Sequence, residues 1–247
     1  MRNIPRIYLN AKLASGAVIE LPVDTAHYLT RVMRIPIGAE FLVFNNGAEF
    51  MAELTEKKDS KKSAFYARIS KSSGRADPSN NLTLAFAPIK QARLEEMMNM
   101  AAQMGVARLQ PVITERTVAN RINWERIGKI ITEAAEQSGR NSIPEILPAQ
   151  KFDEFLGMFK VQSSKFDLFF ADERFTNMRK AQDSHKDNCT LNFEFCTLLI
   201  GPEGGFSDKE FTALDKIGAV GMNLGKTILR AETAAVAAIA QLHAKFM

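Results

Sequence analysis

The sequence predicts an α/β protein in two parts: a small β-rich N-terminal part and a larger part built on a parallel sheet. Short β-like runs dominate the first 71 residues, whereas from residue 82 apolar strands alternate with amphipathic helices. That alternation is typical of a parallel sheet covered by helices. The segment SSGRADPSNN between them is rich in turn-forming residues. We therefore expect a β domain at residues 1–74, a linker at 75–81 and an α/β domain at 82–247.

The N-terminal part is expected to be a small mixed β-barrel of about 70 residues. Its strand-like runs are GAVIELP, FLVFNNGAEFMAEL and SAFYARIS, and the NNG inside the second run predicts a hairpin turn. One helix, DTAHYLTRVMR, interrupts the strands, and its Asp24 is a candidate cap for the first turn.

The C-terminal part is expected to contain five strands and five helices. Gly105 would stop the first of these helices, because glycine readily adopts the left-handed conformation found after a helix end. The predicted strands are LTLAFAPI, ARLQPVIT, FDLFFA, TLLI and VGMNLG. The predicted helices are QARLEEMMNMAAQMG, NWERIGKIITEAAEQSG, DEFLGMFK, SDKEFTALDKIG and AETAAVAAIAQLHAKF.

The positive charge is unevenly distributed. Residues 1–75 hold 12 Lys and Arg against 7 Asp and Glu, a net charge of +5, whereas residues 76–247 hold 20 against 21, a net charge of −1. A basic module joined to a near-neutral one is typical of proteins that bind polyanions such as nucleic acid. The alternative is an ordinary solvated face, since EKKDSKK also reads as a charged hairpin.

Several classes of protein are disfavoured. Cys189 and Cys196 have no second pair to complete a zinc site, and the three histidines are scattered, so we expect no metal. The start, MRNIPRIYLN, lacks the apolar segment of a signal peptide. No run approaches the roughly 18 apolar residues of a membrane helix. These features favour a cytoplasmic protein that does not enter a membrane.

Two glycine-containing stretches near the C-terminus carry the chemistry: LLIGPEGGFSDKEF at residues 198–211 and LGKTILRAETAA at residues 224–235. The GKT is not a P-loop, because the first glycine of that motif would fall at Val220. The GPEGG turn also lacks the G-x-G-x-x-G pattern of dinucleotide-binding folds. The two commonest nucleotide-binding motifs are therefore excluded.

The GPEGG turn has the features of a site for a neutral or cationic ligand. Gly204 and Gly205 permit positive φ angles and let a ligand approach the backbone. Ser207 and Glu210 form an S-x-x-E capping box, with Asp208 beside them. An acidic first turn opposes phosphate binding at the helix start. The alternative is a tight strand-to-helix turn without a ligand.

Together, LLIGPEGGFSDKE and LGKTILRAETAA resemble the paired signature loops of SPOUT methyltransferases. They are most similar to the bacterial family that methylates N3 of a uridine in 16S ribosomal RNA. RIYLN, RVMR, GVARLQPVITERT and EAAEQSGRNSIPEI also resemble segments of that family, so the likeness extends through nearly the whole chain. It implies a SPOUT-type parallel sheet with a deep trefoil knot, an N-terminal PUA-like barrel that binds RNA, and a homodimer.

The resemblance also implies that the two loops hold S-adenosylmethionine. Backbone groups would bind its adenine, and the acidic side chains suit its sulfonium. The implied cofactor-binding residues are Leu199, Ile200, Gly201, Pro202, Glu203, Gly204, Gly205, Leu224, Gly225, Ile228, Leu229, Arg230, Thr233 and Ala234.

RNA contacts are expected from Arg6, Arg31 and Arg34, and from Gln137 and Arg140 in EQSGRN. Arg31 and Arg34 are three residues apart on a predicted helix, so they would share one face and grip neighbouring phosphates. The alternative is that one of these arginines makes an ion pair within its own domain.

The reaction requires loss of the proton on uracil N3. Arg230 is our candidate for the cation that stabilises the uracil anion, and Glu232 or Glu203 could accept the proton. The alternative for Arg230 is a salt bridge that holds its loop. An arginine is a poor proton acceptor, so the general base is not identified.

Two departures from the family pattern leave alternatives open. Met100 and Gln103 replace a lysine and a glutamate of the family stretch Lys-Ala-Thr-Glu-Leu-Gly, and Lys226-Thr227 replaces a common Pro-Arg. A knotted RNA-binding protein with little catalysis is one alternative. Another is a SPOUT methyltransferase that acts on a different RNA, such as transfer RNA.

Overall fold

The computed structural model describes residues 4–45, 47–59, 62–77, 81–118, 121–161, 167–174 and 196–246. The chain forms two compact units. The first comprises Met1–Pro78 and Ala135–Ile143, and the second comprises Ser79–Ala134 and Pro144–Met247. The boundary after Pro78 falls inside the expected linker, but the return of Ala135–Ile143 to the first unit was not predicted.

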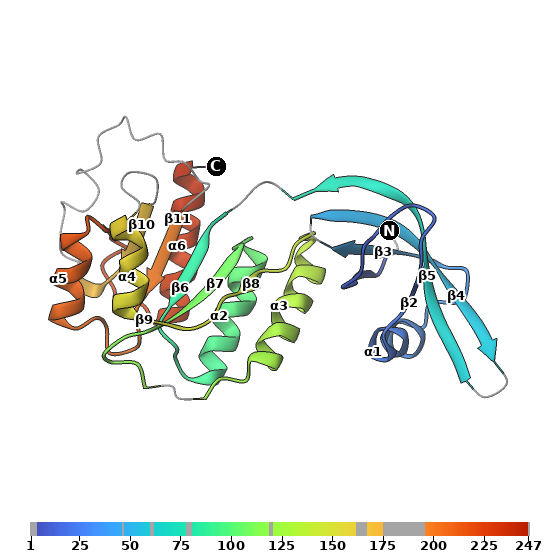
Figure 1. The fold of residues 1–247 in the computed structure, drawn as a ribbon, viewed down its shortest axis with the longest axis horizontal. Coiled ribbons are helices and arrows are strands. Elements are labelled where there is room, and N and C mark those ends of the chain that lie inside the picture. The colour runs from blue at the N-terminus through green and yellow to red at the C-terminus, as the bar shows by residue number, and fades with distance from the viewer. Residues whose placement is uncertain are drawn as a thin grey trace. The chain divides into compact units, whose positions relative to one another are not determined.

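The first unit is built on a five-stranded sheet with strand order β1-β3-β4-β5-β2 (Figure 1). β3 and β4 are antiparallel, with Asn45 opposite Ala48, so the hairpin predicted at NNG is confirmed. Its core buries Phe41, Leu54 and Ile69 together with residues of the helical segment 23–32, which lies between β2 and β3. The strands are β1 (Arg6–Tyr8), β2 (Val18–Glu20), β3 (Glu40–Asn45), β4 (Ala48–Asp59) and β5 (Lys62–Ala76).

The expected linker begins later than predicted. β5 continues through Ala76, because its backbone pairs with β4 as far as Ala48 opposite Ala76. The Ser-rich composition of residues 72–76 therefore marks the end of a long strand, not a connecting loop.

The helix of the first unit differs from the prediction in two details. It consists of α1 (Val23–His27) followed by a π-helical turn, η1 (Tyr28–Val32). The N-cap residue is Pro22 and no side chain caps the turn, so the role given to Asp24 is wrong. The helix ends before Arg34, which has a φ of 52°. Arg31 and Arg34 therefore do not share a helical face, although both are exposed.

The second unit contains the predicted parallel sheet. Its strand order is β12-β10-β11-β6-β7-β8, with β9 also paired to β7, and every pair is parallel. The short strands β8 and β9 were not predicted. The strands are β6 (Thr83–Phe86), β7 (Arg108–Ile113), β8 (Glu145–Ile146), β9 (Gln150–Lys151), β10 (Asp167–Ala171), β11 (Cys196–Ile200) and β12 (Val220–Met222).

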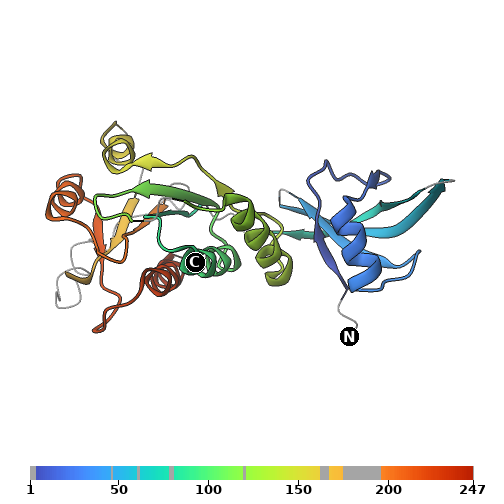
Figure 2. The same cartoon turned by 90° about the horizontal axis from the view of Figure 1, so that it is seen from below.

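Helices cover both faces of this sheet, as the α/β prediction requires. α2 and α6 pack against each other on one face, and α4 and α5 lie on the other (Figure 2). On the α4 and α5 face, Phe155, Phe170 and Phe206 pack with Leu199 and Leu214. The helices are α2 (Gln91–Gln103), α3 (Trp124–Ser138), α4 (Phe152–Val161), α5 (Asp208–Lys216) and α6 (Ala231–Phe246). In the described part of the chain, no helix is long and apolar enough to cross a membrane.

Candidate cofactor and catalytic site

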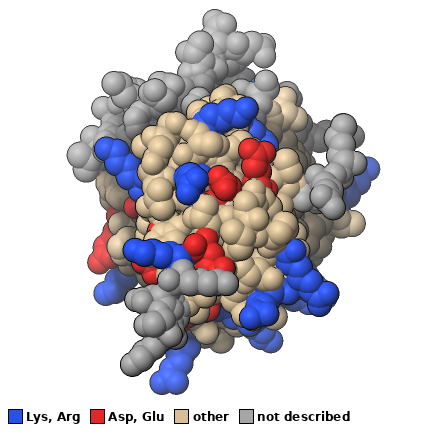
Figure 3. Space-filling model, turned by 90° about the vertical axis from the view of Figure 1, so that its right-hand side faces the viewer, with Lys and Arg blue, Asp and Glu red and all other residues tan. Residues whose placement is uncertain are grey.

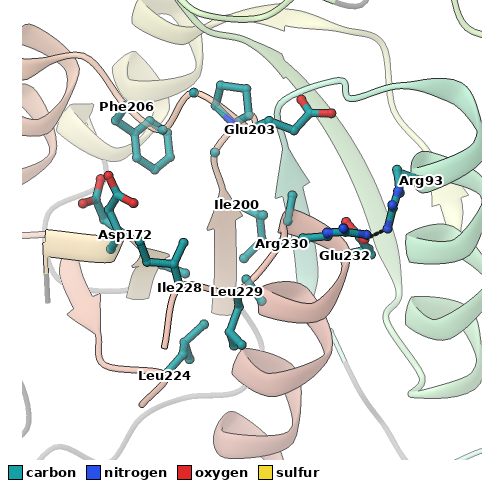
Figure 4. A pocket seen from close by; sticks show the side chains of 18 of the residues that line it. Arg93, Asp172, Ile200, Glu203, Phe206, Leu224, Ile228, Leu229, Arg230 and Glu232 are labelled. Atoms are coloured by element: carbon teal, nitrogen blue, oxygen red, sulfur yellow. Dashed lines mark hydrogen bonds and ion pairs between the residues drawn. The ribbon is translucent and has the colours of Figure 1, made fainter. Parts of the chain in front are cut away.

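A cavity of about 520 Å³ lies in the second unit, at the carboxyl ends of its central strands (Figure 4). Asp172 directly follows β10, Gly201 directly follows β11, and Leu224 lies two residues after β12. Lys90, just before α2, joins them from the segment that follows β6. The carboxyl edge of a parallel sheet is where open α/β folds bind ligands.

The loop after β11 forms one wall of the cavity. Glycine is required at two of its positions for different physical reasons. Gly205 has a φ of 66°, which side chains rarely adopt. A Cβ at Gly201 would lie 3.1 Å from the Phe206 ring, so that ring packs directly over the glycine.

The predicted capping box at the start of α5 is confirmed. The Ser207 amide donates to Glu210 Oε2 at 2.9 Å, and the Glu210 amide donates to Ser207 Oγ at 3.3 Å. Glu210 Oε1 also accepts the Glu115 amide at 2.7 Å, so this buried carboxylate ties the loop to the segment after β7.

The segment between β12 and α6 forms the opposite wall. Gly225 has a φ of 115°, and its amide donates to Asn223 Oδ1 at 2.9 Å. The side chain of Ile228 is 75% exposed although it lines the cavity. Among the residues expected to bind the cofactor, Leu199 is instead buried in the sheet core and Thr233 is exposed outside the lining. The others line the cavity: Ile200, Gly201, Pro202, Glu203, Gly204, Gly205, Leu224, Gly225, Ile228, Leu229, Arg230 and Ala234.

Charged side chains of both signs line the cavity. Figure 4 shows Asp172 on one side, and Arg230, Glu232 and Arg93 on the other. Glu232 Oε1 accepts from Arg93 Nη1 at 2.5 Å, which neutralises this carboxylate. Arg230 is exposed and, among the described residues, makes no ion pair, so the alternative of a loop-holding salt bridge finds no support there.

The Asp172 carboxylate is held by Arg174. The guanidinium donates to both carboxylate oxygens at 2.8 Å, and the Asp172 side chain is only 2% exposed. The hydrogen bonds to Asp172 raise the pKa of Arg174 above its usual value. The Asp172 carboxylate is therefore held in a fixed position at the cavity.

Part of this lining was not predicted from the sequence. The strand-end rule could have identified Lys90 and Asp172, since both follow predicted strands. Arg93 gave no such signal, because its partner is 139 residues away. The missed residues are Lys90, Arg93, Ala171, Asp172, Glu173, Phe206, Thr227 and Ala231.

The departures at Met100 and Gln103 lie outside the cavity lining. Gln103 is exposed and its amide group donates to Asn99 one turn earlier in α2. These substitutions therefore leave the composition of the cavity unchanged.

The structure gives Arg6 a role different from the expected RNA contact. Its side chain is 9% exposed and pairs with Glu49 at 2.5 Å. The remaining donors go to the carbonyls of Ala135, Glu136 and Arg140 and to Asn141 Oδ1. All five N–H groups of the guanidinium are thus used inside the first unit. We therefore withdraw Arg6 from the expected RNA contacts.

The other expected RNA residues differ in exposure. Arg31, Arg34 and Gln137 are exposed, whereas the Arg140 side chain is 17% exposed and lies 3.5 Å from Asp77. Figure 3 views the first unit end-on: basic side chains are spread over this face, with acidic ones between them. On this face the positive charge is therefore distributed and is not gathered into one stripe.

No group of three potential metal ligands occurs among the residues that the structure describes. Cys196 is buried in β11, and burial raises the pKa of its thiol to about 12. Cys189 lies outside the described residues. Cys196 is therefore a core residue and carries no charge at neutral pH.

The family models identify the class of protein. An RNA methyltransferase domain matches residues 76–243, and an RNA methyltransferase PUA domain matches residues 21–64. Two units of this kind, with a ligand-sized cavity in the second, define an RNA methyltransferase that carries a PUA domain.

Two relatives narrow this class of RNA methyltransferases to one family. The ribosomal RNA small subunit methyltransferase E of Rickettsia conorii is 33% identical over 96% of this chain and 94% of its own length. That of Synechocystis is 30% identical over 92% of this chain and 73% of its own length. The chain belongs to the family of ribosomal RNA small subunit methyltransferases E.

Solved structures agree in fold and in cofactor. The Neisseria gonorrhoeae ribosomal RNA small subunit methyltransferase E, bound to S-adenosyl methionine, matches with a TM-score of 0.82 and 27% identity. The match covers 99% of this chain and 98% of that one. A Legionella pneumophila methyltransferase, also bound to this cofactor, has a TM-score of 0.77 and 28% identity over 98% of each chain.

Proposed function

We propose that this protein transfers a methyl group from S-adenosylmethionine to N3 of a specific uridine in the 16S RNA of the small ribosomal subunit. The observation that carries the proposal is the cavity at the strand ends, which is lined by charged side chains of both signs. The names of the relatives support ribosomal RNA of the small subunit as the substrate. The ligand of the Neisseria structure supports S-adenosylmethionine as the cofactor.

The cavity fits this cofactor by size and by charge. Its volume of about 520 Å³ is in the range of small-molecule sites. The carboxylates of Asp172, Glu173 and Glu203 line it and suit a cation, which agrees with the exclusion of phosphate-binding motifs. The absence of side chains at Gly204 and Gly205 leaves room for the cofactor to lie against the backbone of the loop. When bound, S-adenosylmethionine supplies a methyl group on positively charged sulfur.

The protein must also present an unpaired uridine whose N3 has lost its proton. A paired base hides N3, so the nucleotide has to leave its stack. Arg230 is exposed at the cavity, where its fixed charge stabilises a uracil anion. Placed there before the reaction, the guanidinium acts without a costly rearrangement.

The two candidate proton acceptors differ in their surroundings. Glu232 is held by Arg93 at 2.5 Å and is buried, so we assign it a positioning role. Glu203 is exposed on the cavity wall and, among the described residues, has no ion-pair partner. We propose Glu203, or water that it orients, as the route by which the N3 proton leaves.

RNA binding by the first unit is part of the proposal. Arg31 and Arg34 are exposed, three and six residues after Tyr28, which is 41% exposed. Guanidinium groups bind phosphates, and an exposed aromatic ring offers a stacking surface for a base. Gln137 and the edge of Arg140 are weaker candidates in the same unit.

Three further properties follow from the resemblance and remain proposals. They are the trefoil knot in the second unit, assembly as a homodimer, and action in the cytoplasm, where ribosomes are assembled. We also expect a preference for assembled small subunits over protein-free RNA, because assembly presents the unpaired uridine in a fixed position.

The test is transfer of labelled methyl from S-adenosylmethionine to small subunits that lack the modification, with large subunits and protein-free 16S RNA in parallel. We expect label in small subunits and much less in the other two. Equal labelling of protein-free 16S RNA would contradict the preference for subunits, and labelling of large subunits alone would contradict the proposed substrate.

A further inference from the structure

The cofactor loop is held only in part by its own residues, through a hydrogen bond from the Gly205 amide to the Pro202 carbonyl at 2.9 Å. Residues 201–205 include three glycines, and glycine loses more backbone freedom on ordering than any other residue. A loop that binds a ligand through its peptide groups must hold those groups in fixed directions before binding. Contacts from outside the loop therefore decide how well it binds.

Arg116 supplies one such contact. It follows β7, and its Nη1 donates to the Gly204 carbonyl at 2.7 Å. Its side chain also packs against the glycine, with Cδ 3.5 Å from the position of a Cβ at Gly204. The neighbouring Glu115 amide bonds to Glu210 at 2.7 Å, which anchors the backbone that carries Arg116.

Arg174 supplies a second contact, two residues further along the loop. Its Nη2 donates to the Phe206 carbonyl at 3.2 Å. The guanidinium is itself fixed by Asp172 and by Asp208, and its Cζ lies 3.8 Å from the centre of the Phe211 ring.

The two contacts lie on either side of Gly205, the residue of the loop with a positive φ. Fixing the Gly204 carbonyl orients the peptide group that precedes this glycine, and fixing the Phe206 carbonyl orients the peptide group between Phe206 and Ser207. Neither arginine belongs to the loop, and Arg116 does not line the cavity. Its effect on the cofactor must therefore pass through the loop.

We propose that Arg116 and Arg174 form a clamp that holds the cofactor loop in its binding conformation before S-adenosylmethionine arrives. Both are positioning residues in this role. The proposal rests on the assignment of the cavity as the cofactor site.

The experiment measures binding of S-adenosylmethionine by calorimetry, and amide hydrogen exchange of residues 203–207 without cofactor. Arg116→Ala is the main variant, because Arg116 is exposed and its removal leaves no buried charge. We expect about tenfold weaker binding and faster exchange in the loop, with unchanged exchange in β11. Arg116→Lys should recover part of the affinity, since an ammonium group can still donate to the Gly204 carbonyl.

Arg174→Lys is the second variant, because it keeps a positive charge beside the buried Asp172. It should also weaken binding and speed loop exchange. The matched control is Arg126→Ala, which removes an exposed arginine from an ion pair with Glu95 far from the loop in sequence. This control should bind S-adenosylmethionine like the unmodified protein.

Normal cofactor affinity and normal loop exchange in both Arg116→Ala and Arg174→Lys would overturn the clamp. Failure of the unmodified protein to bind S-adenosylmethionine would instead overturn the proposed function. The exchange measurement needs no cofactor, so the two failures are distinguishable.

Discussion

Arg93 and Glu232 form an ion pair of 2.5 Å that joins the first turn of α2 to the first turn of α6 at the cavity. The Glu232 side chain is 8% exposed and that of Arg93 is 38% exposed, so the carboxylate is the buried partner. A buried charge that loses its partner costs more than the pair itself contributes.

Arg93→Ala should therefore lower the free energy of unfolding by about 1–2 kcal/mol, because Glu232 would remain buried without its cation. Urea unfolding measures the change. The control is Lys129→Ala, which breaks an exposed pair with Glu125 in α3 and should lower the free energy of unfolding much less than Arg93→Ala does. An equal loss of unfolding free energy in the two variants would show that the burial of Glu232 does not affect the stability of the protein.

Arg230→Ala should act mainly on the rate of methyl transfer. Loss of a preorganised charge beside a developing anion costs about 100-fold in kcat. Arg230→Lys keeps the charge and should retain more of the rate. Single-turnover kinetics at saturating cofactor separates the chemical step from binding. A variant with normal kcat and weakened cofactor binding would show that Arg230 binds S-adenosylmethionine and does not assist the reaction.

Two neighbouring glycines should respond differently to alanine. Gly205 has a φ of 66°, and an alanine there would be strained by about 1–2 kcal/mol. At Gly204 the new Cβ would make an ordinary contact of 3.5 Å with Arg116. The folded state should therefore be less stable in Gly205→Ala and nearly unchanged in stability in Gly204→Ala. The opposite order of stability in scanning calorimetry would contradict the loop conformation.

The Cys196 thiol should be unreactive in the folded protein. Burial raises its pKa to about 12 from an ordinary value of 9.0, so the thiolate that attacks alkylating reagents is scarce. In a Cys189→Ser variant at pH 8, alkylation should be about 1,000-fold slower than after unfolding in urea, because the thiolate fraction falls by about that factor. Rapid alkylation of the native protein would contradict this burial.

The raised pKa of Cys196 also sets the sign of a pH effect. The unfolded thiol ionises near pH 9, whereas the folded thiol stays neutral until about pH 12. The contribution of the neutral thiol to stability is thus complete below pH 9 and is lost as the pH rises from 9 to 12. In the same Cys189→Ser background, Cys196→Ala should flatten this alkaline part of the stability curve, and an unchanged slope would contradict the assignment.

The periodicity of apolar residues predicted the sheet and helices of the second unit, because each element carries its own local pattern. The capping box of Ser207 and Glu210 is likewise local, and the structure confirms it. The strand β11, which begins at Cys196, and the two glycine-containing loops could be predicted for the same reason.

Contacts between distant segments were not predictable. Arg6 looks like an RNA contact by charge alone, but its partners include Glu49 and Asn141, which lie 43 and 135 residues away. Arg116 is separated from Gly204 by 88 residues. No local pattern in a single sequence encodes such pairs, so the clamp and the Arg93 ion pair emerge only from the folded chain.

The most direct test of the account is nucleoside analysis of 16S RNA from unmodified small subunits after reaction with this protein and S-adenosylmethionine. We expect 3-methyluridine, at an amount approaching one per subunit, and its strong reduction with Arg230→Ala. Methylation at another atom of uridine, or on another nucleotide, would contradict the proposed reaction. Absence of any product while S-adenosylmethionine still binds would show that the small-subunit uridine is not the acceptor.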